Sequence, residues 1–350
     1  MQALLGVVFH FIGGFASGSF YIPFKKVKEW AWESYWIIGG LFSWLIAPLI
    51  AAYFTVPDFM SIISSTDAAI VFWTYFLGVL WGVGGLTFGL GVRYLGVSLG
   101  QTFVLGLSSA FGALMPPIYR DLIGSDSGET FTGMLNSTSG QVVLLGIFVC
   151  LIGIVICGKA GVMKENELSD EQKQVGVQEF NIRKGLTVGV ISGVLSACFN
   201  YGIEAGKPMA EEAVLNGGNS LFQNNVTFVV ILWGGLTTNF IWCMILNARN
   251  RTFGDYANKK APLTRNYLFS ALAGTTWFMQ FFFYGMGESK LGNGASSWIL
   301  HMAFIILISN MWGLALGEWR DVARKTFRTI LTGIAVIILS VIVVGYGNSL

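Results

Sequence analysis

Four ionisable side chains lie within or at the ends of long apolar stretches. His10 and His301, the only histidines, lie inside such stretches, and Glu204 and Glu288 each end one. A neutral imidazole enters apolar surroundings at low cost and exchanges protons near physiological pH. Because ionisable groups inside a membrane are costly, they are functional candidates by default. We predict His10 or His301, and then Glu204, as the proton-coupling group. The alternatives are an interhelical hydrogen bond for each histidine and interfacial exposure for the glutamates.

Amide and aromatic side chains in the same stretches suit a neutral sugar. Amides bond to sugar hydroxyls, and ring faces pack against sugar C–H surfaces. A phosphate or carboxylate would require arginine, and no arginine lies deep in an apolar stretch. The predicted substrate site comprises His10, Asn200, Trp277, Gln280, Tyr284 and His301. Lipid contact or core packing is the competing explanation for most aromatic residues near Trp277.

Two lysines stand out at the ends of apolar stretches. Lys25 follows Pro23-Phe24, and Lys207 precedes Pro208 on the side of the membrane where basic residues are scarce. We predict a gate or ion-pair role for both, with Glu204 as a partner for Lys207. The alternative is surface anchoring, which suits most of the lysines around Lys25.

The apolar stretches predict ten membrane-crossing helices, at about 20 residues for each crossing. Only 11% of the 350 residues are charged, whereas soluble proteins carry about 25%. Glycine pairs four residues apart, such as Gly85/Gly89 and Gly189/Gly193, indicate close helix packing. The predicted crossings are residues 3–24, 34–56, 68–92, 94–119, 140–158, 185–203, 225–248, 266–287, 291–317 and 329–347.

Basic residues are sorted between the links that join these crossings. Odd-numbered links hold 18 of the 21 lysines and arginines, and even-numbered links hold only Arg120, Lys207 and Lys290. The positive-inside rule then places the odd-numbered links in the cytoplasm. We expect a multi-pass protein of the bacterial inner membrane with both termini in the periplasm. No lysine or arginine precedes the first apolar stretch, so no cleavable signal is expected.

A polar linker divides the crossings into two sets of five. The first half is residues 1–160, the cytoplasmic linker 161–184 and the second half 185–350. Residues 81–96 align without gaps to residues 277–292, with identities that include Trp81/Trp277 and Gly89/Gly285. An odd number of crossings inverts one half relative to the other. The predicted fold is therefore an all-α polytopic membrane protein with two inverted five-helix repeats, as in many secondary transporters.

Other functional classes lack their motifs. The sequence has no GxSxG, HExxH or GxxxxGK[ST] motif, and its four cysteines show no metal-ligand spacing. We predict no enzyme activity, no metal and no cofactor beyond a coupling proton. The expected partners are a small sugar and the bilayer, without nucleic acid or an obligate protein partner. A metabolite or drug exporter and a membrane sensor are the alternatives.

Several segments resemble the bacterial L-rhamnose–proton symporters of the drug/metabolite transporter superfamily. They include residues 20–28, 93–96, 179–181, 280–284 and 297–302, the segment around His10, and Met209 after Lys207-Pro208. The resemblance covers nearly the whole chain and implies ten helices and rhamnose uptake with a proton. His10, Lys25, Lys26, Lys207, Gln280 and His301 lie within the matching motifs. The chain departs from the family pattern at residues 84–88 and 120–140 and at Glu211 and Glu212, which leaves another deoxy-sugar or a hexose open.

Overall fold

The computed structural model describes residues 2–95, 97–124, 129–167, 182–315, 317 and 319–350. These residues are helical or lie in links, with no β-strand among them, as predicted. In chain order the elements are α1 (Gln2–Ser19), α2 (Tyr21–Phe24), α3 (Trp32–Leu41), the π-turn η1 (Phe42–Ile46), α4 (Ala47–Thr55), α5 (Phe59–Ser65), α6 (Ala68–Leu95), α7 (Val97–Ile123), α8 (Phe131–Asn136), α9 (Thr138–Glu167), α11 (Ile182–Ala205), α12 (Lys207–Leu215), η2 (Ser220–Phe222), α13 (Asn224–Asn250), η3 (Phe253–Ala257), α14 (Leu263–Leu291), α15 (Gly294–Ala315) and α16 (Arg324–Gly347).

The helices have the length and surface of membrane-spanning segments. Eight helical stretches in the described residues are long and apolar enough to cross a bilayer. α7 and α14, with 27 and 29 residues, occupy the other two predicted positions. Phe148, Val155 and Ile342 are each more than half exposed. Because a soluble protein rarely exposes so much apolar surface, the chain is a polytopic membrane protein, as predicted.

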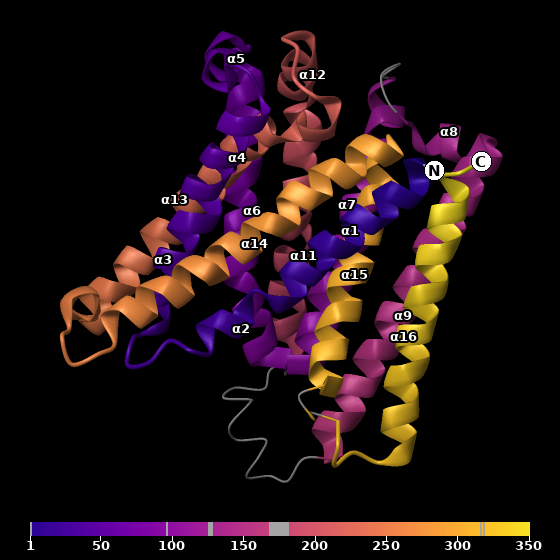
Figure 1. Ribbon diagram of the computed structural model, residues 1–350. Coiled ribbons are helices and arrows are strands. Elements are labelled where there is room, and N and C mark those ends of the chain that lie inside the picture. The colour runs from indigo at the N-terminus through magenta and orange to yellow at the C-terminus, as the bar shows by residue number, and fades with distance from the viewer. Residues whose placement is uncertain (1, 96, 125–128, 168–181, 316, 318) are drawn as a thin grey trace.

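The two ends of the helix bundle hold different parts of the chain (Figure 1). Both termini lie at one end together with α5, α8 and α12, and we call this the N/C end. The opposite end, which we call the α2 end, holds α2 and the link between α13 and α14. An even number of membrane crossings places both termini at the same end of a bundle, as is observed here.

Two predicted boundaries differ from the structure. α9 continues to Glu167 and so extends into the stretch predicted as a linker, and its Ala160 and Gly161 are still buried beyond residue 158. Residues 168–181 of that linker lie outside the described residues. The single predicted crossing over residues 34–56 consists of α3, η1 and α4. Its π-turn ends one residue before Ala47-Pro48, where the missing proline N–H is one cause of irregular helix geometry.

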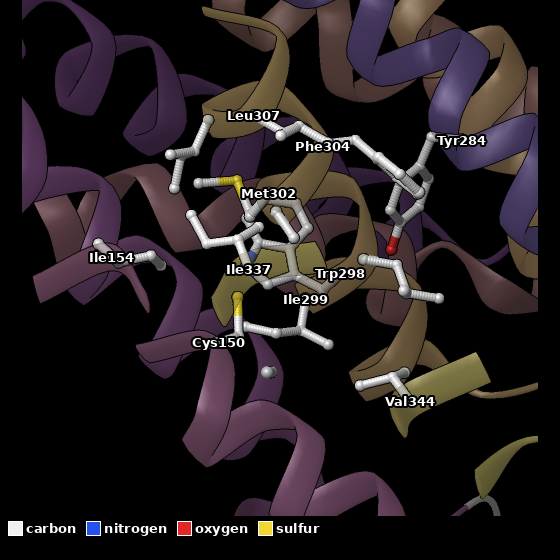
Figure 2. Close-up of a cluster of buried hydrophobic side chains, with 14 of the residues drawn as sticks. Cys150, Ile154, Tyr284, Trp298, Ile299, Met302, Phe304, Leu307, Ile337 and Val344 are labelled. Carbon is white, nitrogen blue, oxygen red and sulfur yellow. The ribbon is translucent and has the colours of Figure 1, made fainter. Parts of the chain in front are cut away.

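The bundle packs through close helix pairs. α1 lies against α14 and α15, α6 against α11 and α13, and α9 against α16. Glycines allow the α9–α16 approach, since a Cβ at Gly153 would lie 2.7 Å from Ile337 Cγ1. Figure 2 shows part of the larger buried cluster, to which α9, α14, α15 and α16 contribute residues such as Cys150, Trp298 and Ile337. Small residues at the contacts are the usual basis of helix association in lipid.

The α6–α13 crossing brings backbone directly against backbone. A Cβ at Gly78 would overlap the carbonyl of Ile231, whereas a Cβ at Gly85 on the same helix would meet nothing within 4 Å. We expect Gly78→Ala to lower stability by about 1–3 kcal/mol, because the two backbones must separate. Gly85→Ala is the matched control and should be neutral or slightly stabilising. Thermal unfolding in detergent measures both, and equal melting temperatures would contradict this packing.

Candidate functional site

Four of the residues singled out in the sequence lie along one side of α14. Trp277, Tyr284 and Glu288 are spaced by seven and four residues, and Gln280 lies between the first two. This spacing aligns side chains along one side of a helix. α14 runs from the α2 end to the N/C end (Figure 1). This row of side chains, which we call the α14 stripe, therefore passes three levels of the bundle: the α2 end, the middle and the N/C end.

At the middle level, Tyr284 lies between the two histidines. Its ring centroid is 5.2 Å from that of His10 and 5.2 Å from that of His301, edge-on to both. The two imidazole centroids are 6.1 Å apart. His10 is 0%, Tyr284 1% and His301 4% exposed. Three helices, α1, α14 and α15, thus enclose both histidines in what we call the histidine cluster, formed by His10, Tyr284 and His301.

Glycines admit the imidazole rings. A Cβ at Gly287 would lie 2.7 Å from Nε2 of His10. A Cβ at Gly13 would lie 3.4 Å from Cε1 of His301 and 3.0 Å from the carbonyl oxygen of Gln280. Gly287 therefore leaves open the space that the His10 ring occupies, and Gly13 allows the backbone of α1 to lie close to the His301 ring and the Gln280 carbonyl.

Hydrogen bonds fix Tyr284 relative to neighbouring helices. Its hydroxyl donates to Oδ1 of Asn200, 3.1 Å away, and Nδ2 of Asn200 donates to the carbonyl of Gly112 at 2.8 Å. Beside it, Nε1 of Trp298 donates to the carbonyl of Ser108 at 2.9 Å. α14, α11, α7 and α15 are thereby tied together around the histidine cluster. Asn200 therefore lies at the level of the histidine cluster. Both its side-chain oxygen and its side-chain nitrogen already form hydrogen bonds within the protein.

Several polar atoms at this level have no protein partner. Within the described residues, both ring nitrogens of His10, Nδ1 of His301 and Nε2 of Gln280 are buried without a hydrogen bond. Leaving a buried polar group unpaired costs about 1–3 kcal/mol, so such groups are uncommon. Sugar hydroxyls both donate and accept, which matches imidazole and amide groups together. The arrangement can bind a neutral polar solute and hold a proton.

At the N/C end, the stripe meets a group of charged residues. Arg120 forms an ion pair with Glu204 and also donates to the backbone carbonyl of Glu129 at 3.0 Å. Nδ2 of Asn224 donates to Glu288 at 2.5 Å. The first contact joins α7 to α11, and the second joins α13 to α14. Glu204, predicted for proton coupling, thus has an arginine partner that the sequence did not indicate.

Glu129 extends this group of charges toward α15. Its carboxylate accepts a hydrogen bond from Asn293, the residue just before α15. Burial raises the pKa of the Glu129 carboxyl, and the Asn293 bond and the Arg120 charge only partly oppose that effect. We call Arg120, Glu129, Glu204 and Glu288 the carboxylate network.

Trp277 lies at the α2 end of the stripe, away from the histidines. Its ring centroid is 3.9 Å from that of Phe20 and 5.9 Å from that of Trp36, edge-on to both. Trp36 also contacts Trp44 at 6.1 Å. Sequence reasoning missed Trp36 and Trp44. The available signal was their eight-residue spacing on either side of the Gly39-Gly40 pair in the second crossing.

The two predicted lysines lie outside the buried levels. Lys25 directly follows α2, and Lys207 opens α12. Both are exposed. Lys207 interacts electrostatically with Glu288, whereas Glu204 forms its ion pair with Arg120. A gate or ion-pair role for either lysine stays a prediction.

The fold and the buried polar site define a class of protein: a polytopic membrane protein, helical throughout its described elements, with a buried set of polar and aromatic groups between its helices. Among the described residues, no three His, Cys, Asp or Glu side chains gather as metal ligands.

The sequence matches the protein family described as L-rhamnose-proton symport protein (RhaT) over residues 1–349. Relatives named L-rhamnose-proton symporter occur in Yersinia pestis (strain Pestoides F) and Yersinia pseudotuberculosis serotype O:3 (strain YPIII). Each is 38% identical over 349 residues, covering 98% of both chains.

This chain belongs to the L-rhamnose-proton symport protein family. The resemblance stated from the sequence motifs is therefore confirmed. The family consists of transporters, which also confirms the prediction that the chain is not an enzyme.

The Arg120–Glu204 pair can be tested through stability. Arg120→Gln leaves the Glu204 carboxylate without its charged partner, and we expect a loss of about 1.5–3 kcal/mol. Adding Glu204→Gln should recover most of the lost stability, because no unpaired charge then remains. Thermal unfolding of both single variants and the double variant measures the coupling. Additive effects of the two substitutions would contradict a direct pair.

Proposed function

We propose that this protein imports L-rhamnose together with a proton by alternating access. The observation that carries the proposal is the 38% identity to named L-rhamnose-proton symporters over 98% of both chains. The buried histidine cluster supports it, because it combines groups that bind hydroxyls with groups that hold a proton. The names of the relatives give no support to an exporter.

The proposed substrate site is the one that the sequence predicts: His10, Asn200, Gln280 and His301, with Tyr284 as an apolar wall between the histidines and Trp277 as an apolar wall nearer the α2 end. The contacts between Tyr284 and both histidines support this grouping. The unpaired Nε2 of Gln280 supports a hydroxyl acceptor at the same level. The sugar lies against the edges of these side chains and completes their hydrogen bonds.

His10, His301 and Glu204 are the proposed proton-coupling groups. With imidazole centroids 6.1 Å apart, a proton on one ring disfavours a second proton on the other, because like charges repel strongly where water is excluded. The histidine cluster then holds one proton at a time. Glu204 lies at the N/C end, where it offers a first acceptor for an entering proton once Arg120 moves away.

The ten helices form two inverted halves, residues 1–160 and 185–350, joined by the linker 161–184. The pattern of helix contacts supports this proposal. Exchanging α1 with α11, α3 with α13, α6 with α14 and α7 with α15 converts three of the closest helix pairs into three other observed pairs. α6–α11 corresponds to α14–α1, α6–α13 to α14–α3, and α7–α11 to α15–α1. Inverted halves that rock against each other around a central site are a common basis of alternating access.

We also propose that the N/C end faces the periplasm of a bacterial cell and the α2 end the cytoplasm. Lys25, Lys26 and Lys28 follow α2, and Lys259 and Lys260 join α13 to α14, both at the α2 end (Figure 1). A basic cytoplasmic side is the usual orientation. Lys25 and Lys207 then lie at opposite ends of the pathway, as gate or ion-pair residues.

Uptake into vesicles tests the function directly. With a proton gradient, acid on the N/C side, we expect labelled L-rhamnose to accumulate above its outside concentration, because proton entry drives sugar entry. A protonophore should reduce uptake to simple equilibration. Equal uptake with and without the gradient would contradict proton coupling. An absence of L-rhamnose uptake would contradict L-rhamnose as the substrate.

Glutamine substitutions separate coupling from binding. Glutamine cannot take up a proton but still forms hydrogen bonds. If His10 or His301 carries the proton, His10→Gln or His301→Gln should abolish gradient-driven accumulation while exchange of labelled for unlabelled L-rhamnose continues. Exposed Lys26→Gln is a control for membrane insertion. Gradient-driven accumulation that persists in both histidine variants would contradict histidine coupling.

A further inference from the structure

An aromatic crevice lies beside the α14 stripe at the α2 end. Trp277 of α14 forms one wall, and Trp44 of the π-turn η1 and Trp36 of α3 line the side contributed by the second crossing. The space inside it is about 10 Å³, which is close to the smallest volume that holds one water molecule. In this conformation the crevice therefore has no room for a sugar.

Three of the residues that line this crevice each carry a buried hydrogen-bonding group without a partner. Ser43 Oγ, Trp44 Nε1 and Trp277 Nε1 are buried without a hydrogen bond in the described part of the chain. Ser43 is 2% and Trp44 3% exposed. A buried indole N–H normally finds an acceptor. Three such groups in one crevice suit a ligand rather than a passive core.

The chemistry of the crevice selects one kind of ligand. None of the residues that line it is charged, so an ionic ligand would lose its hydration without compensation. Tryptophan faces pack against sugar C–H surfaces, and the two indole N–H groups and the hydroxyl can bond to sugar hydroxyls. A neutral monosaccharide fits both features.

The backbone around the crevice is irregular where an opening movement would act. Ser43 and Trp44 lie in the π-turn, an irregularity that is frequent at functional sites. Gly39 and Gly40 precede it, and a Cβ at Gly39 would lie 2.6 Å from the ring of Phe24 in α2. A shift of the short helix α2 would therefore change the volume of the crevice.

We propose that this crevice is a second sugar subsite, which Trp44, Ser43 and Trp277 form on the α2 side of the histidine cluster. Trp277 precedes Tyr284 by seven residues on α14, or about 10 Å along the helix axis. The sugar occupies the subsite after it leaves the histidine cluster, when the crevice has opened. This inference rests on the proposed sugar transport and assigns it a place on the path toward the α2 end.

Conservative substitutions test the subsite. Trp44→Phe removes the indole N–H and keeps an aromatic ring, and Ser43→Ala removes the hydroxyl. Each should raise the half-saturating L-rhamnose concentration on the α2 side by about 3–10-fold, the value of one neutral hydrogen bond. The effect on the N/C side should be smaller. Vesicles of opposite orientation, loaded with labelled L-rhamnose for exchange, measure the two sides separately.

Trp233→Phe is the matched control. The Nε1 of Trp233 is also buried without a partner, but Trp233 lines a different, apolar groove with Tyr75 and Val230. The same chemical deletion there should leave both half-saturating concentrations unchanged. If Trp44→Phe and Ser43→Ala give the same half-saturating concentrations as Trp233→Phe on both sides, the proposed subsite is contradicted.

Direct binding keeps this inference separate from the transport proposal. Tryptophan fluorescence of the purified protein, titrated with L-rhamnose, other deoxy-sugars and hexoses, reports binding without uptake. A wild-type protein that fails to transport L-rhamnose but binds another neutral sugar, more weakly after Trp44→Phe, would overturn the proposed substrate and support the subsite. Wild-type protein that binds none of these sugars would overturn the subsite as well.

Discussion

The contact of Tyr284 with both His10 and His301 is the interaction on which the rest of the site depends. It places two imidazoles and a phenol in the interior of an apolar bundle, where an unpaired polar group costs about 1–3 kcal/mol. The surrounding structure makes that burial possible. Glycine backbones at Gly13 and Gly287 leave room for the rings, and Asn200 fixes the tyrosine hydroxyl. The remaining unpaired nitrogens are the groups that a bound sugar or proton can satisfy.

The α14 stripe joins this level to two chemically different ends. Toward the N/C end it meets the carboxylate network, in which Arg120 holds Glu204. Toward the α2 end it meets tryptophans and a serine without charge. A proton is best received among carboxylates, and a neutral sugar is best released along aromatic faces. A single helix therefore gives the proposed pathway a direction, and helices from both halves of the chain complete each level.

The sequence allowed much of this site to be predicted, for a physical reason. Ionisable residues are so rare in the apolar stretches that His10 and His301 could be grouped without knowing how the helices are rotated, and Tyr284 was added to them only as an apolar wall. The same reasoning placed Trp277 in that group, whereas its ring packs with Phe20 and Trp36. Ser43 was missed because a π-turn changes which residues face inward, whereas Trp44 had an available signal in its spacing from Trp36. Arg120 was counted only as a basic residue in a link, since its partner is 84 positions away.

Glycine spacing was a partial guide to packing for a similar reason. Gly189 and Gly193 do pack closely against α7, whereas a Cβ at Gly85 or Gly89 would meet no neighbour within 4 Å. A small-residue pair shows that two helices are able to approach, but the partner must also present its surface there. The apolar crossings were predicted from hydropathy alone, and eight of them meet the length and hydropathy of a membrane span in the described residues. The contacts between them depend on rotations that only the assembled bundle shows.

The most direct test of the central site is thiol labelling after Gln280→Cys. Gln280 is buried beside the histidine cluster, and the four native cysteines are buried as well, which keeps background labelling low. A membrane-permeant maleimide should react with the introduced thiol slowly, and L-rhamnose should slow that reaction further, with half-protection near the half-saturating concentration for uptake. Labelling that saturating L-rhamnose leaves unchanged, in a variant that still transports it, would show that the sugar does not pass this level of the bundle.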